Sequence, residues 1–100
     1  MKSSVFQYPY SKVFRRTQDV LHKMGLRITG IDARKGTINA ERGFSIRKPK
    51  YKIDLVVEEM ENHNTRVTVN GVLLSQIFFQ RDFNAEICES EILEVLSTAI

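Results

Sequence analysis

The chain has 100 residues, of which 42% are hydrophobic and 27% are charged, and its formal net charge is +3 at pH 7. This length is enough for one globular domain with a single core and too short for two. The single cysteine, Cys88, excludes an intramolecular disulfide, and no apolar run approaches the roughly 20 residues of a membrane span. We therefore expect one cytoplasmic domain over residues 1–100, mildly basic, so that nucleic acid is permitted as a partner but not indicated.

The start of the chain predicts a short extended segment followed by an amphipathic helix. Val5 and Phe6 stand before Pro9, and the fixed φ of proline suits the first turn of a helix. Apolar side chains then recur at helical spacing as far as Met24, with charged side chains on the opposite side. Gly25 follows them, and glycine is the residue that most easily adopts the left-handed conformation found at helix ends.

Four strands joined by short turns are predicted next. The expected strands cover residues 26–31, 37–46, 51–58 and 66–74. Asp32 and Gly36 suit the first turn, because aspartate can bond its own backbone and glycine accepts a positive φ. We expect a bulge at Gly43, a hairpin loop at residues 47–50 and a further turn at residues 61–64.

A second helix is predicted from near Phe83 to the end of the chain. Asp82 or Asn84 is the expected N-cap, and Glu86 and Glu89 suit the positive end of the helix dipole. Residues between the last strand and this helix are apolar without a clear period, and we expect an irregular passage there. The apolar stripe of the helix consists of Ala85, Cys88, Ile92, Val95, Leu96 and Ala99.

This order of elements predicts an α+β fold. Short turns connect antiparallel neighbours, and a meander sheet with one apolar face needs a cover that two amphipathic helices can supply. We expect a two-layer sandwich with the order (β)-α-β-β-β-β-α, in which four strands, or five with the first segment, form the sheet.

The pattern from the first helix to the first hairpin is similar to that of small, largely uncharacterised bacterial domains. It is carried by Tyr8, Pro9, Tyr10, Val13, Gly25, Ile28, Asp32, Gly36, Ile38 and Ala40. The order of elements also resembles the half-repeat of the TATA-box-binding-protein-like fold and the related helix-grip arrangements. The resemblance implies a fold and carries no activity.

Little in the sequence indicates catalysis, a metal or a cofactor. His22 falls on the polar side of the first helix and His63 in a turn, so we expect both at the surface and apart. Cys88 lies in an apolar stripe, which indicates a structural thiol. Glu58, Glu59 and Glu61 could attract a divalent cation weakly, but we favour a solvated hairpin end, because the fixed ligand spacing and glycine of a calcium-binding loop are missing. We expect a chain that is not an enzyme and has no cofactor.

A basic segment is the first candidate binding site. It consists of Arg47, Lys48, Lys50 and Lys52 with Tyr51 between them, and Arg34 and Lys35 could extend it. Cations bind phosphates and an aromatic ring stacks on an unpaired base, which is how single-strand binders work. Lysine and proline at a hairpin also protect a sheet edge from pairing, so the segment has a structural interpretation as well.

An apolar cluster is the second candidate. Its proposed interface residues are Val72, Leu74, Ile77, Phe78, Phe79 and Phe83. These residues could belong to the core, form a homodimer contact, or line a groove between helix and sheet for a lipid or another apolar small molecule. We expect a non-enzymatic interaction module that self-associates as a homodimer, with nucleic-acid binding and apolar-ligand binding as the alternatives.

Overall fold

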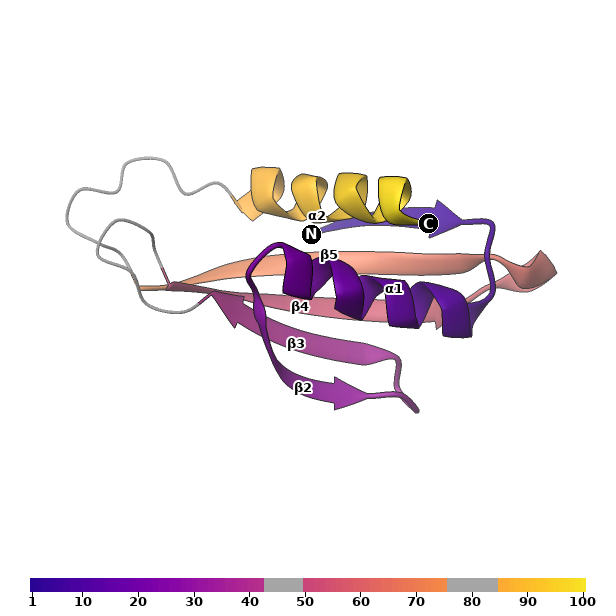
Figure 1. Cartoon of the computed structure of the whole chain (residues 1–100), viewed down its shortest axis with the longest axis horizontal. Helices are drawn as coiled ribbons and strands as arrows, with labels where there is room; N and C mark the ends of the chain where they lie inside the picture. The colour runs from indigo at the N-terminus through magenta and orange to yellow at the C-terminus, as the bar shows by residue number, and fades with distance from the viewer. Residues whose placement is uncertain (43–49, 76–84) are drawn as a thin grey trace.

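A five-stranded antiparallel sheet forms one layer of the structure, a computed structural model that describes residues 1–42, 50–75 and 85–100. The strand order is β1-β5-β4-β3-β2 (Figure 1). The strands are β1 (Lys2–Phe6), β2 (Arg27–Asp32), β3 (Thr37–Arg42), β4 (Lys50–Glu59) and β5 (Thr65–Ser75). The predicted meander of neighbouring strands is confirmed, and the first segment is its fifth strand.

Two helices form the second layer. They are α1 (Tyr10–Lys23) and α2 (Ala85–Ala99), which lie side by side and run in opposite directions along the sheet (Figure 1). Helix α1 contacts β2 and β4, whereas α2 contacts β1 and β5. The predicted α+β sandwich with the order β-α-β-β-β-β-α is therefore confirmed.

The first strand, β1, does not pair with β2, the strand that follows it in the sequence. β1 lies against β5, with Lys2 opposite Val69 and Phe6 opposite Thr65. Because β1 and β2 occupy opposite edges of the sheet, α1 has to cross the sheet between them. This crossing places α1 on the same face of the sheet as α2, with α1 over β2 and β4 and α2 over β1 and β5.

The core lies between the two layers. Alternate residues of the central strands form a continuous apolar row, since Ile38 pairs with Leu55 and Leu55 pairs with Val69. All three side chains are at most 1% exposed. The larger set of buried apolar residues is Phe6, Val13, Phe14, Val20, Leu21, Leu26, Ile38, Ala40, Tyr51, Ile53, Leu55, Val57, Val67, Val69, Ile92, Leu93 and Leu96.

The turn between β2 and β3 forms as the sequence predicts. Asp32 Oδ1 accepts hydrogen bonds from the backbone N–H groups of Arg34 at 3.0 Å and Lys35 at 3.2 Å. Gly36 has a φ of 71°, and its carbonyl accepts a hydrogen bond of 2.7 Å from the N–H of Val57. The turn is thereby attached to the central strand β4.

Other local predictions have mixed outcomes. Gly25 follows Met24, the C-cap of α1, and has a φ of 78°, as expected just past a helix end. The last strand continues to Ser75, which agrees with the predicted extension to about Leu74. A bulge that the sequence did not indicate lies in β2 between Ile28 and Gly30. The predicted bulge at Gly43, the N-cap at Asp82 or Asn84 and residues 47–49 of the predicted loop at 47–50 lie outside the described residues, while Lys50 is the first residue of β4 and not part of the loop.

Neither helix among the described residues combines the length and the apolar character needed to cross a membrane.

Replacing Gly36 by alanine should destabilise the fold more than replacing Gly25. A Cβ atom at Gly36 would collide with the carbonyl oxygen of Val57, whereas a Cβ atom at Gly25 has nothing within 4 Å. Both positions have a positive φ, which costs a non-glycine residue about 1–2 kcal/mol. We expect Gly25→Ala to lose about that amount and Gly36→Ala at least about 3 kcal/mol, measured by urea unfolding. Equal losses in the two variants would contradict the docked turn.

Candidate functional site

The helices leave one face of the sheet uncovered, and we call this surface the open face. It carries the side chains that alternate with the buried ones along the strands. Its members on the three strands β3, β4 and β5 are Thr37, Asn39, Glu41, Lys52, Asp54, Val56, Glu58, Arg66, Thr68, Asn70 and Val72. Threonine, asparagine and balanced charges dominate the set, as expected for a sheet face in contact with water.

The charges of the open face are paired with one another. Arg27 of β2 bonds Glu41 of β3, and Lys52 lies 3.7 Å from Asp54 within β4. The guanidinium of Arg66 donates to both carboxylate oxygens of Glu58 at 3.2 Å. The charged groups of this surface are thus ion-paired with one another, although Asp54 Oδ1 and Arg66 Nε are buried without a hydrogen-bond partner among the described residues.

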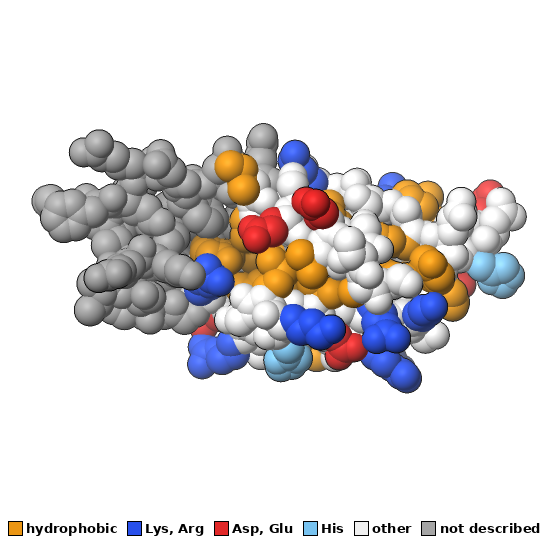
Figure 2. Space-filling model, turned by 45° about the horizontal axis from the view of Figure 1, so that its top comes forward, with side chains coloured by type: hydrophobic (Ala, Val, Ile, Leu, Met, Phe, Trp, Pro, Cys, Tyr) orange, Lys and Arg blue, Asp and Glu red, His pale blue; other side chains and the backbone are white. Residues whose placement is uncertain are grey.

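The helix-covered face carries charges of a different kind. Helix α1 has four basic residues and one acidic residue, Asp19, whereas the segment of α2 has four glutamates and no lysine or arginine. Figure 2 shows basic side chains gathered along α1, acidic ones over α2, and hydrophobic side chains between them. We call this surface the helix layer. Its basic row consists of Lys12, Arg15, Arg16 and Lys23, and its acidic row of Glu91 and Glu94.

Most charges of the helix layer lack an ion-pair partner among residues 1–42, 50–75 and 85–100. Arg16 lies 3.9 Å from Asp19, and the ammonium of Lys12 stands 4.4 Å from the centre of the Tyr8 ring. Within the residues that the structure describes, neither Arg15 nor Lys23 forms an ion pair. The same is true of the acidic row. Ile87, one helical turn before Glu91, is 64% exposed.

A buried carboxylate holds α2 against the sheet. Glu89 is 1% exposed, and its Oε2 accepts a hydrogen bond of 2.7 Å from the backbone N–H of Gly71 in β5. Its Oε1 lies 2.9 Å from the α-ammonium group of Met1, next to β1. Glu89 thus connects α2 to two strands. The sequence interpretation of Glu89 as a residue placed for the helix dipole missed this role, although Glu89, Ile92 and Leu96 share one helical stripe.

The thiol of Cys88 is a structural group. Burial raises the pKa of Cys88, the hydrogen bond with Tyr51 lowers it, and the nearby Glu91 carboxylate raises it further. The pKa of Tyr51 is raised as well, first by burial and then by its hydrogen bond with Cys88. A thiol with a raised pKa is a poor nucleophile near neutral pH.

The predicted basic segment is divided between two faces. Tyr51 is 6% exposed and lies in the core, with the guanidinium of Arg42 5.7 Å from its ring centre, while Lys52 points to the open face. The expectation that Tyr51 stacks on a base beside these lysines is corrected, because adjacent residues of a strand point to opposite sides. Arg47 and Lys48 lie outside the described residues, as does the side chain of Lys50.

The predicted apolar interface is described only at its start. Val72 belongs to the open face and is 42% exposed. Leu74 lies in β5, and its side chain is not described. The remaining members, Ile77, Phe78, Phe79 and Phe83, lie outside the described residues, so this interface stays a prediction.

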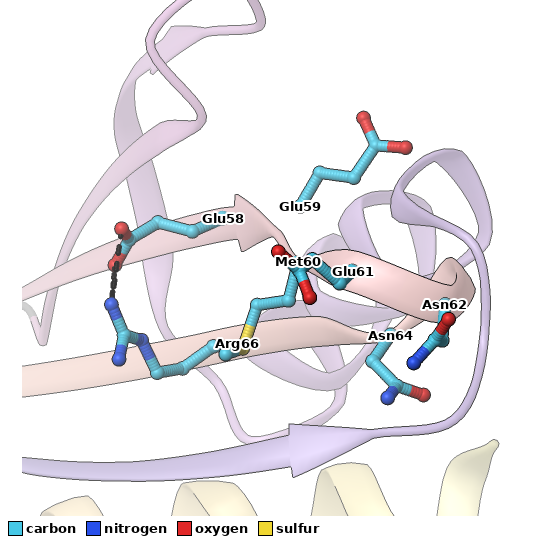
Figure 3. Close-up of a pocket in the computed structure, with 7 residues that line it drawn as sticks. All are labelled: Glu58, Glu59, Met60, Glu61, Asn62, Asn64 and Arg66. Carbon is cyan, nitrogen blue, oxygen red and sulfur yellow. Dashed lines mark hydrogen bonds and ion pairs between the residues drawn. The ribbon is translucent and has the colours of Figure 1, made fainter.

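An open depression of about 790 Å³ lies at the turn between β4 and β5. It is lined by Glu58, Glu59, Met60, Glu61, Asn62, Asn64 and Arg66 (Figure 3). In Figure 3, Glu58 faces Arg66 and the carboxylate of Glu59 points away from the other side chains. Among the described residues, no group of three or more His, Cys, Asp or Glu side chains could hold a metal ion. His22 and His63 are both exposed, as the sequence predicts.

Comparisons with known proteins identify the fold. No protein-family model matches the chain, and no curated protein matches it. The chain is similar to a solved structure, the adenylate sensor from AMP-activated protein kinase in complex with 5-aminoimidazole-4-carboxamide 1-beta-D-ribofuranotide. The TM-score is 0.73 at 13% sequence identity, covering 95% of this chain and 94% of the other.

A second similar structure is the uncharacterized conserved protein YugN from Geobacillus kaustophilus. Its TM-score is 0.39 at 10% sequence identity, covering 98% of this chain and 82% of that one, too low a score to support an argument. The similarity to the sensor chain shows the fold alone, because the identity is low. The finer resemblance to the TATA-box-binding-protein-like fold stays a prediction.

Replacing Glu89 by alanine should strongly destabilise the chain. The substitution leaves the partly buried N–H of Gly71 without its acceptor and removes a buried side chain, which together cost about 2–4 kcal/mol. Glu89→Gln keeps an acceptor oxygen and should lose less. The matched control is Glu94→Ala, an exposed position on the same helix, expected to change stability by less than about 0.5 kcal/mol in urea unfolding. A similar result for Glu89→Ala and Glu94→Ala would show that the buried bond contributes nothing.

Stability should fall at alkaline pH because of Tyr51 and Cys88. Both groups have a raised pKa in the folded state, so their contribution is complete below the unfolded values, about 8.5 for cysteine and about 10 for tyrosine. The contribution is lost as pH rises through the folded values. Urea unfolding at about pH 7 and about pH 10 should show a larger loss for the natural chain than for Tyr51→Phe combined with Cys88→Ala. Identical losses would contradict the shifts.

Proposed function

We propose that this chain is a non-enzymatic interaction module that self-associates. The observation that carries the proposal is the contrast between its two surfaces. The open face pairs its charges internally, whereas the helix layer presents rows of opposite charge whose members mostly lack partners among the described residues. Charges that a fold leaves unpaired on one face favour a contact with another charged surface.

The polar groups buried in the described part of the chain support a role without catalysis. The Glu89 carboxylate bonds a backbone N–H and an ammonium group, and the Cys88 thiol bonds Tyr51. A catalytic group needs a shifted pKa together with access to a substrate and a second reacting group. These side chains instead connect α2 to the sheet, which is a structural task.

The alternatives from the sequence receive less support. Nucleic-acid binding through the basic segment loses its stacking residue, since Tyr51 is buried, and Lys52 is close to Asp54. Binding of an apolar small molecule needs an apolar cavity. Among the described residues, the depressions at the β4–β5 turn and along the first turns of α1 are lined mostly by charged and polar side chains, whereas Ile77, Phe78, Phe79 and Phe83, on which this alternative depends, lie outside the described residues.

Self-association is testable by sedimentation equilibrium. We expect the average mass to rise from the monomer mass of 11.6 kDa toward twice that value as concentration increases from about 1 µM to about 1 mM. A single-stranded oligonucleotide added in the same experiment should not co-sediment with the chain. A mass that stays at the monomer value over the whole range would disprove the proposed function.

A further inference from the structure

The charge pattern of the helix layer is self-complementary. The basic row of Lys12, Arg15, Arg16 and Lys23 lies on α1, and the acidic row of Glu91 and Glu94 lies on α2. All six side chains are exposed, and α1 and α2 are neighbours that run antiparallel (Figures 1 and 2). A surface with one positive and one negative half fits a second copy of itself when that copy is turned by half a turn.

We infer that two copies of this chain pair through their helix layers, with α1 of each copy against α2 of the other. This inference rests on the proposed function, and it specifies how the two self-associating copies are arranged. The two-fold axis lies in the interface, parallel to the helices and above the seam between α1 and α2. Rotation about it brings each basic row over the acidic row of the second copy. The contact is isologous, so both pairings form together and no helix layer remains unpaired to continue into a filament.

The same charges argue against another symmetric arrangement. Strand β1 is a regular edge of the sheet and could pair with β1 of a second copy. Because α2 lies over β1, that pairing would bring the two acidic rows toward each other. Like charges at an interface disfavour association. The helix layer is therefore the face on which a second copy is attracted.

The size of the layer sets the strength of the contact. Helices of 14 and 15 residues are about 21–23 Å long, and two side by side are about 20 Å wide. The patch is on the order of 400 Å² per copy, about half of what a stable specific interface buries. The dimer is consequently weak, with a Kd of about 10 µM or higher, and it depends on charge.

The salt dependence of the dimer affinity distinguishes this charged contact from an apolar one. Raising the salt concentration from about 50 mM to about 500 mM should weaken the dimer about tenfold, because exposed charges are screened. An interface formed by the apolar residues 72–83 would instead keep or increase its affinity. Association that is insensitive to salt would overturn the helix-layer geometry while the proposed self-association stands.

Charge reversal gives the sharpest test. Lys12→Glu, Arg15→Glu and Arg16→Glu together leave three carboxylates and one cation, Lys23, in the former basic row, so both rows are acidic. Glu91→Lys with Glu94→Lys makes both rows basic. Each of these two variants alone should lose the dimer, with a Kd raised at least about tenfold in sedimentation equilibrium. A mixture of the two should form a heterodimer, since each basic row then meets an acidic one. The variant with all five reversals should again form a homodimer.

Two control variants change residues outside the helix layer. Glu59→Lys with Glu61→Lys changes the net charge by the same amount as the α2 reversal, but at the exposed turn between β4 and β5, and should leave the Kd unchanged. Val72→Lys should also leave it unchanged. If Val72→Lys abolishes the dimer and the mixture of reversed variants stays monomeric, the helix-layer geometry is wrong. Thermal unfolding followed by circular dichroism establishes that each variant is folded.

Discussion

The structure depends on the burial of one face of the sheet beneath two antiparallel helices. Ile38, Leu55 and Val69 lie in one row on this face and are almost completely excluded from water. Because strand side chains alternate, burying these residues turns their neighbours toward the opposite side. The constraint places Tyr51 in the core and Lys52 on the open face, so a basic segment that is continuous in sequence is divided in space.

Polar contacts between elements fix the two layers to one another. Glu89 bonds the backbone of β5 from within the apolar side of α2, and Tyr51 of β4 bonds Cys88 of the same helix. The hydroxyl of Tyr10, at the start of α1, donates to the carbonyl of Ala33 at 2.9 Å. Bonds between elements far apart in sequence fix how helices and sheet are oriented, which apolar contacts alone specify less strictly.

The two outer surfaces then differ because of how charge is distributed over the elements. On the open face, basic and acidic residues alternate between neighbouring strands and meet as ion pairs such as Arg66 with Glu58. In the helix layer each helix has mainly one sign of charge, so opposite charges are separated by the width of the seam between helices. That separation lowers the attraction within one copy and leaves it available to a second surface.

The sequence by itself determined the element types, the tight turns and the outward positions of His22 and His63, because helical and strand periods and turn residues such as Asp32 and Gly36 are local signals. The charge difference between the helices was also present in it, as a count of residues over each segment. Only the tertiary structure decided that β1 pairs with β5, that Glu89 reaches Gly71, and that α1 and α2 share one layer. These relations join residues far apart in the chain, and they follow from packing both apolar helix faces on one side of one sheet.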